Sequence, residues 1–190
     1  MKNIGIVLIL LLGYLTIQAQ PSQIDYRSIP TGVTIDNNQL IYNALKDTPH
    51  VYIFYAPECP LSQKYTLTIA SLFTKFGNKV KFIGVFPGSE ESIGQFQEFK
   101  TKYKINYPLI KDEKLELISA LKATVTPEAF LIDSYGKIVY HGAIDDWAIK
   151  LGKTKQQATV NYLENAIEGL LNNTAVETRY VKPIGCYIEQ

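Results

Sequence analysis

The feature that most constrains the fold is a run of β-forming residues that leads into a cysteine and then into an amphipathic helix. Val51–Tyr55 has no polar interruption, which is typical of a central strand buried on both faces. Next comes the segment Ala56-Pro57-Glu58-Cys59-Pro60-Leu61-Ser62, and apolar residues then recur three and four positions apart up to Phe76. That spacing predicts one face of a helix, which Gly77 ends. A strand followed at once by a helix predicts an α/β fold with Cys59 at the junction.

Further elements extend this unit into a mixed sheet. The patterns predict strands at 80–86, 128–133 and 137–143, a short extended piece at 107–110, and helices at 36–47, from a cap at Ser89 through Tyr103, at 115–121 and at 155–171. Helices between the early strands require parallel crossovers, whereas Ser134-Tyr135-Gly136 predicts the turn of an antiparallel hairpin. We therefore expect one domain of the α/β class, with a mixed central sheet and helices on both faces.

Cys59 is placed where a thiolate is favoured over a thiol. The first amide groups of a helix have no partner within it, and the helix dipole is positive at that end. Pro60 suits the first helical position because it lacks the N–H that would be unpaired there. The alternative is that Cys59 is a buried small apolar residue, which is a common fate of a lone cysteine. The junction and the flanking prolines favour the reactive thiolate.

The same segment resembles the active site of thioredoxin-like proteins. Phe54–Ser62 is similar to the thioredoxin active-site segment, with Cys59 at the attacking position, and Thr126-Pro127 resembles the cis-proline loop that faces that site. Three further stretches are similar to exported redoxin-domain proteins of the TlpA/ResA and AhpC/TSA-related group: Thr126–Asp133, Gly136–Tyr140 and Gly142–Asp146. The resemblance covers roughly residues 33–171 and implies a thioredoxin-like fold and thiol–disulfide chemistry. It further implies substrate contacts from four residues, namely Thr126, Pro127, Pro60 and Glu58.

Two departures from that family pattern limit what the site can do. The second cysteine of a C-x-x-C motif would fall at position 62, which is Ser62, so a mixed disulfide at Cys59 has no local thiol to resolve it. Ser62 can instead hydrogen-bond a thiolate, or it is simply a polar residue in the first turn. Peroxiredoxins carry a threonine three residues before the attacking cysteine and a proline seven before it, where this chain has Ala56 and Tyr52.

Cys186 is the other cysteine, 127 positions after Cys59. It lies in a Gly-Cys tail that resembles the tail of some exported redoxin-domain proteins. It could resolve the Cys59 intermediate, remain inert or bond to another chain, and the sequence does not distinguish these. Three functions follow: a thiol–disulfide oxidoreductase acting through Cys59, Ser62 and Cys186, a binding module without turnover, and a thiol peroxidase.

The amino-terminal residues predict export. Lys2 and the apolar run Ile4–Leu12 are typical of a secretory signal that is cut after Ala19. The alternative is an uncleaved membrane anchor, but the run from Ile4 to Ile17 spans 14 residues, fewer than the roughly 20 that cross a bilayer. The expected organisation is a signal peptide at 1–19, a lead-in segment at 20–32, the thioredoxin-like domain at 33–171 and a tail at 172–190. Cleavage leaves 18 basic and 18 acidic residues, and no basic stripe is visible. We expect a periplasmic or extracellular protein whose partners are thiols and disulfides, with no nucleic acid and no stable membrane span.

The remaining candidates have ordinary explanations. Glu58 is adjacent to Cys59 and would raise the thiol pKa or shuttle a proton, although a solvated loop carboxylate is the simpler interpretation. His50 and His141 do not match any zinc spacing with the two cysteines, so we expect no metal. Asp145-Asp146-Trp147 would line a partner surface or form a turn before the last helix. The glycines lack the spacing of a nucleotide loop, and no cofactor is implied.

Overall fold

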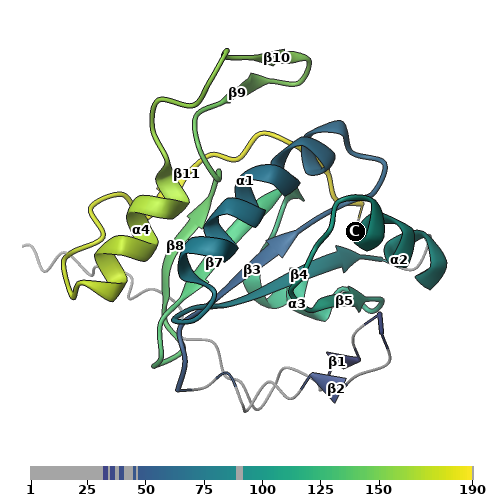
Figure 1. The fold of residues 1–190 in the computed structure, drawn as a ribbon, viewed down its shortest axis with the longest axis horizontal. Coiled ribbons are helices and arrows are strands. Elements are labelled where there is room, and N and C mark those ends of the chain that lie inside the picture. The colour runs from purple at the N-terminus through teal and green to yellow at the C-terminus, as the bar shows by residue number, and fades with distance from the viewer. Residues whose placement is uncertain are drawn as a thin grey trace, which may run out of the picture.

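A six-stranded mixed sheet forms the centre of the protein (Figure 1). The computed structural model describes residues 32–33, 35–36, 39–40, 45, 47–88 and 92–189, so the predicted signal peptide and nearly all of the lead-in segment lie outside the described residues. The strands of this sheet are β3 (His50–Phe54), β4 (Lys81–Pro87), β5 (Leu109–Asp112), β7 (Glu128–Ile132), β8 (Ile138–Gly142) and β11 (Tyr180–Val181). Their order is β11-β8-β7-β3-β4-β5.

Helices cover both faces of this sheet, which confirms the predicted architecture. They are α1 (Pro60–Phe76), α2 (Ile93–Lys102), α3 (Glu116–Leu121) and α4 (Tyr162–Leu171). The buried side chains of α1, α2 and α4 belong to one hydrophobic cluster, and those of α3 belong to a second cluster on the other side of the sheet. In β3, β4, β5 and β7 the two clusters are supplied by residues on opposite faces of the strand, because successive side chains of a strand point to opposite faces.

β3 is the central strand, and its position explains its uninterrupted apolar sequence. It pairs in parallel with β4 and antiparallel with β7, and all five of its residues are buried. Both edges and both faces of the strand are therefore covered, as expected for a run without polar alternation. A short loop joins the carboxyl end of β3 to α1. The Cys59 junction therefore lies at the carboxyl end of the central strand.

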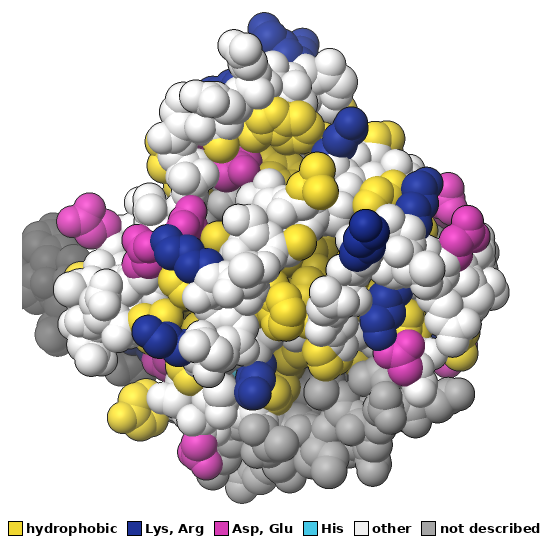
Figure 2. Space-filling view, viewed as in Figure 1, with side chains coloured by type: hydrophobic (Ala, Val, Ile, Leu, Met, Phe, Trp, Pro, Cys, Tyr) yellow, Lys and Arg dark blue, Asp and Glu magenta, His cyan; other side chains and the backbone are white. Residues whose placement is uncertain are grey.

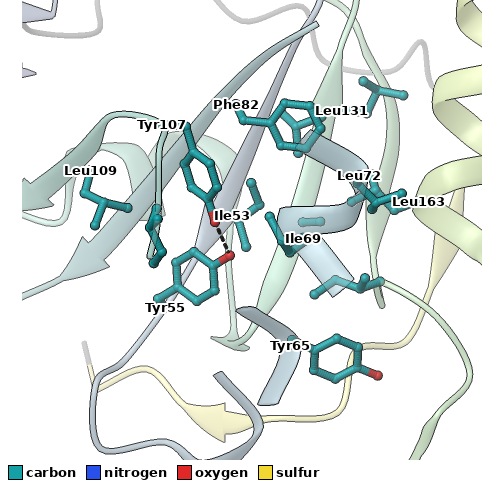
Figure 3. Packing of buried hydrophobic residues seen from close by; sticks show 14 of the residues in the cluster. Ile53, Tyr55, Tyr65, Ile69, Leu72, Phe82, Tyr107, Leu109, Leu131 and Leu163 are labelled. Atoms are coloured by element: carbon teal, nitrogen blue, oxygen red, sulfur yellow. Dashed lines mark hydrogen bonds between the residues drawn. The ribbon is translucent and has the colours of Figure 1, made fainter. Parts of the chain in front are cut away.

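Two tyrosines of this core pair their hydroxyl groups. Tyr55, just after β3, and Tyr107, just before β5, are buried beside α1, and their hydroxyl oxygens lie 2.7 Å apart in a hydrogen bond (Figure 3). A buried hydroxyl without a partner would cost stability. Burial raises the pKa of both phenols, so both are neutral at physiological pH.

The predicted helix at 36–47 is wrong at its centre. Gln39–Leu40 forms strand β2, which pairs antiparallel with β1 (Gly32–Val33). Asp36, expected to cap that helix, forms an ion pair with Lys100 of α2. The apolar spacing is compatible with a helix, but the residues of β2 pair with the adjacent strand β1 instead.

The amino-terminal cap of α2 also differs from the prediction. The cap is Ser92, whose hydroxyl accepts a hydrogen bond from Gln95 N at 3.3 Å, while the Gln95 side chain accepts from Ser92 N at 2.7 Å. This reciprocal arrangement is a capping box and satisfies two amides at the helix start. Ser89, the predicted cap, lies outside the described residues.

The last helix begins at Tyr162 rather than at Lys155. Before it, β9 (Ala148–Lys150) and β10 (Lys153–Thr154) form a short antiparallel hairpin that projects from the body (Figure 1). Asp146 then accepts hydrogen bonds from the backbone of Thr159 and Val160 at 2.7 and 3.0 Å. These contacts hold the segment before α4 in an irregular conformation, and the apolar helical spacing begins only after it.

The carboxyl-terminal tail crosses the sheet to the Cys59 junction, which the sequence did not predict. Its first part is β11, which extends the sheet beside β8. Its second part is β12 (Cys186–Tyr187), which pairs antiparallel with β6 (Val125–Thr126). The tail is therefore part of the folded domain.

Charged side chains are interspersed on the face seen in Figure 2. Lys and Arg alternate with Asp and Glu there, and the described residues of this face form no continuous basic stripe. This distribution matches the near-zero net charge of the sequence. None of the helices that the structure describes is both long and apolar enough to cross a bilayer.

Candidate active site

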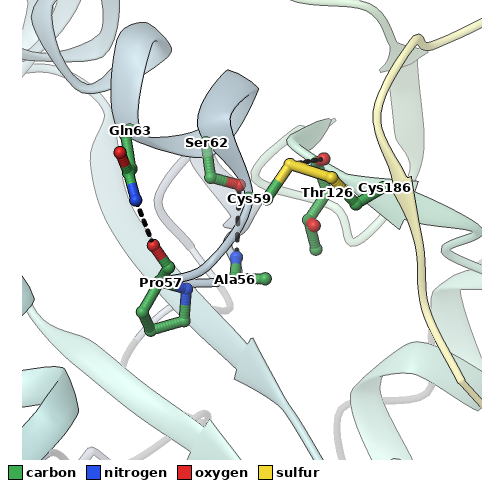
Figure 4. Close-up of a disulfide and its surroundings, with 7 residues drawn as sticks. All are labelled: Ala56, Pro57, Cys59, Ser62, Gln63, Thr126 and Cys186. Atoms are coloured by element: carbon green, nitrogen blue, oxygen red, sulfur yellow. Dashed lines mark hydrogen bonds between the residues drawn. A yellow bond between two sulfur atoms is a disulfide. The ribbon is translucent and has the colours of Figure 1, made fainter. Parts of the chain in front are cut away.

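Cys59 lies at the start of α1, as the sequence predicted. It is the residue that precedes the first helical turn, Pro60 is in the first position of that turn, and no side chain caps the helix. The first turn of α1 contains no acidic residue, so nothing on the helix itself offsets its positive end. The loop before it is held by Gln63, whose side chain donates to the Pro57 carbonyl oxygen at 2.7 Å (Figure 4).

Cys59 forms a disulfide bond with Cys186 (Figure 4). Their Cα atoms are 6.1 Å apart, within the range that a disulfide spans. Pairing of β12 with β6 brings the tail cysteine to this position, with Cys186 opposite Thr126. Cys59 is buried beneath the tail, and Cys186 is half-buried.

The loop at Thr126-Pro127 forms the other wall of the site. Its peptide bond is cis, and Cys59 Sγ lies 3.1 Å from the Thr126 carbonyl oxygen. In the disulfide the sulfur carries no hydrogen, so this is a close contact; in the reduced protein a Cys59 thiol can donate to that oxygen.

Ser62 is buried beside the disulfide (Figure 4). Its hydroxyl oxygen accepts a hydrogen bond from Ala56 N at 3.2 Å, which ties the first turn of α1 to the end of β3. The residue is therefore not a solvated polar side chain of the first turn. Glu58 and Pro60 are exposed next to Cys59.

The buried carboxylate of Glu128 was missed by the sequence analysis. It follows Pro127 in β7, and its Oε2 accepts hydrogen bonds from Thr124 N at 2.8 Å and Val125 N at 3.4 Å. These bonds fix the segment that forms β6, the strand on which the tail pairs. Glu128 Oε1 also lies 4.0 Å from Nδ1 of His141 in β8. The charged residue directly after Pro127, in an otherwise apolar strand, was the available signal.

A second buried carboxylate lies on the other side of Pro127. Asp145 accepts hydrogen bonds from the Tyr65 hydroxyl at 2.6 Å and from Trp147 N at 2.9 Å. Burial raises the pKa of Asp145, and its hydrogen bonds oppose that effect. A cavity of about 140 Å³ adjoins this pair and the tail; its lining includes Tyr65, Pro127, Asp145, Tyr162, Lys182 and Ile184. Asp145 is thus not part of an open partner surface.

Neither histidine reaches the disulfide, and no group of three or more His, Cys, Asp or Glu side chains within the described ranges could hold a metal ion. His141 stacks on Phe130, with ring centroids 5.3 Å apart. His50 is buried at the start of β3, where its Nδ1–H donates to the Thr48 carbonyl oxygen at 2.9 Å. Burial lowers the pKa of His50 to about 4.

We expect His50 to make folding sensitive to acid. Between pH 6.5 and about 4 the unfolded chain binds a proton at this residue and the folded chain does not, so stability falls as the pH falls. The loss attributable to His50 is about 3 kcal/mol across that window. Urea unfolding of the protein and of His50→Asn, measured at several pH values, tests this expectation. The same pH slope in both proteins would contradict it.

Comparison with known proteins places the chain in a family. A family model described as the AhpC/TSA family matches residues 29–141. The chain belongs to the AhpC/TSA family. The match spans both walls of the site of this AhpC/TSA family member, Cys59 and Thr126-Pro127, but not Cys186. No curated protein matches the chain in sequence.

Solved structures share the fold of this AhpC/TSA family member. An uncharacterized conserved protein from Geobacillus kaustophilus is 22% identical with a TM-score of 0.76, covering 92% of this chain and 94% of its own. A hypothetical protein from Sinorhizobium meliloti 1021 is 23% identical with a TM-score of 0.71, covering 87% and 96%. A secreted Mycobacterium tuberculosis disulfide oxidoreductase homologous to E. coli DsbE is 17% identical with a TM-score of 0.57, covering 78% and 98%. The predicted thioredoxin-like fold is thereby confirmed.

Proposed function

We propose that this AhpC/TSA family member is an exported thiol–disulfide oxidoreductase whose redox pair is Cys59 and Cys186. The observation that carries the proposal is the disulfide between a cysteine at a strand-to-helix junction and a cysteine on the tail, beside a Thr-cis-Pro loop. A C-x-x-S site lacks a local resolving thiol, and Cys186 provides one from a distant part of the chain.

In this mechanism the Cys59 thiolate attacks a substrate disulfide. The unpaired amides at the start of α1 stabilise the thiolate, and Ser62 supports it by fixing the turn between β3 and the helix. Thr126 and Pro127 hold the substrate chain, with Glu58 and Pro60 at the rim. Cys186 then attacks Cys59 Sγ, releases the reduced substrate and restores the disulfide.

Burial of Cys59 is compatible with this mechanism because the tail itself supplies the cover. Cys59 is only 2% exposed in the disulfide form, and Cys186 is the more accessible partner. An incoming reductant thiolate therefore meets Cys186 first, and Cys59 is the leaving thiolate at the helix start. Leaving groups of low pKa accelerate such exchange.

Export to the periplasm or the extracellular space forms part of the proposal. Its support is the apolar run Ile4–Leu12 of the sequence together with the Cys59–Cys186 disulfide, since most structural disulfides occur in oxidising compartments. A similarly folded Mycobacterium tuberculosis protein is described as a secreted disulfide oxidoreductase. The proposed partners are protein or small-molecule thiols and disulfides.

The decisive experiment measures the thiols of the mature protein and their reactivity. We expect no free thiol before reduction and two after it, and we expect Cys59 to alkylate with an apparent pKa well below about 8.5. Mass spectrometry of the alkylated peptides assigns each rate to its cysteine. Slow alkylation of Cys59 in the reduced, folded protein would exclude the proposed chemistry and favour a binding module without turnover.

A further inference from the structure

The tail meets the site as an extended strand rather than as an irregular loop. Cys186 pairs with Thr126 and Tyr187 with Val125 in antiparallel register, and Ile188 N donates to the Thr124 carbonyl oxygen at 3.1 Å. β6 and β12 form a two-stranded sheet separate from the central one. Backbone pairing of this kind is how proteins bind extended peptides at a strand edge.

The side chains of the tail alternate between contact with the protein and exposure. Ile184 packs against the cluster that contains Cys59, Cys186 forms the disulfide, and Ile188 packs against the cluster on the other face of the sheet. Tyr187 is 84% exposed. The site therefore contacts the positions two before and two after the cysteine, and it leaves the position directly after the cysteine free.

The position directly before the cysteine is the most restricted one. At Gly185 a Cβ atom would lie 2.3 Å from the Thr126 carbonyl oxygen, 2.7 Å from its carbonyl carbon and 3.2 Å from Pro127 N. All three are backbone atoms of a loop that Glu128 fixes from the other side, so they cannot rotate away as a side chain would. A chain in this register must have glycine at that position.

We propose that the β6 edge is a binding site for extended polypeptides in which glycine directly precedes the reactive cysteine, and that β12 is its tethered occupant. This inference rests on the proposed function, since it names the substrate class of the Cys59 reaction. Tail and substrate use the same backbone groups, so the site binds one of them at a time. Opening of the Cys59–Cys186 disulfide by an external dithiol frees the edge.

The exchange at this site balances as follows. The Cys59 thiolate attacks the cysteine sulfur of a Gly-Cys peptide disulfide, a bond between the two sulfurs forms, and the other half of the peptide disulfide leaves as a thiolate. The Cys186 thiolate then attacks Cys59 Sγ, and the peptide thiolate leaves. Two electrons pass from the protein dithiol to the peptide disulfide, and the released thiolates take protons from water.

Peptides that copy residues 182–189 test the inference on the full-length Cys186→Ala variant. Each peptide carries thionitrobenzoate as a mixed disulfide on its cysteine, so attack by Cys59 releases the coloured thiolate. One peptide has the natural sequence, a second has alanine in place of the glycine, and a third, the matched control, has alanine in place of the tyrosine. The uncleaved tail of the variant competes equally with all three.

We expect the natural peptide to react at least about tenfold faster than the alanine-for-glycine peptide, because overpacking against backbone is costly. The control peptide should react within about twofold of the natural one, since that side chain is exposed. Equal rates for the glycine and alanine peptides would overturn the inference. A symmetrical aromatic disulfide that carries no peptide distinguishes failure of this inference from failure of the proposed function. If Cys59 does not react even with that compound, the proposed function itself is refuted.

The tail provides an intramolecular version of the same test. In full-length Gly185→Ala, with both cysteines present, the equilibrium constant for closing the disulfide in a glutathione buffer should fall by about tenfold or more. Tyr187→Ala should leave it nearly unchanged. An unchanged equilibrium in Gly185→Ala would contradict the restriction at this position.

Discussion

Replacement of Cys59 by serine is expected to abolish thiol–disulfide exchange, whereas Cys186→Ser is expected to permit one round and then stop. The reason is the division of roles at the site. Cys59 lies at the helix start that stabilises a thiolate, and Ser62 provides no second thiol in the first turn. Without Cys186, the mixed disulfide between Cys59 and substrate has no thiol to resolve it.

This split is measured by following product and mixed disulfide together. The protein is first reduced, the excess dithiol is removed, and a substrate disulfide is then added. Cys186→Ser should release about one equivalent of product per protein and retain the other half of the substrate as an adduct on Cys59. The Cys59→Ser/Cys186→Ser double variant defines the background. Continued turnover by Cys186→Ser at the rate of the unaltered protein would remove Cys186 from the mechanism.

Reduction of the disulfide is expected to lower the free energy of unfolding by about 3–5 kcal/mol. The bond joins residues 127 positions apart, so it constrains most of the unfolded chain. It also anchors β12 on β6, and loss of that pairing adds to the effect. The domain itself should remain folded, because both hydrophobic clusters are formed mainly by residues before the tail.

Urea unfolding with and without a reductant measures this difference. The double variant should resemble the reduced protein and should not respond to the reductant, which controls for effects of the reductant itself. A difference below about 1 kcal/mol between oxidised and reduced protein would mean that the tail contributes little to the folded state.

Much of the fold follows from local sequence. The uninterrupted apolar run of β3, the helical spacing of α1 and the turn at Gly136 each depend on neighbouring residues, and all three predictions are confirmed. The prediction of a helix at 36–47 was wrong at its centre. A short apolar pattern is compatible with a strand as well as a helix, and here an adjacent strand pairs with it. The predicted start of α4 at Lys155 was also wrong. Asp146 accepts hydrogen bonds from the backbone of Thr159 and Val160, and these bonds keep residues outside the helix that the pattern alone assigned to it.

The sequence by itself determined that Cys59 stands at a strand-to-helix junction and that Thr126-Pro127 resembles the loop opposite, because both signals are local motifs. Only the tertiary structure decided what surrounds them. The Tyr65–Asp145 hydrogen bond and the disulfide with Cys186 join residues 80 and 127 positions apart in the chain. The disulfide depends on the path of the tail, which β11 directs along β8 and which no short-range pattern encodes.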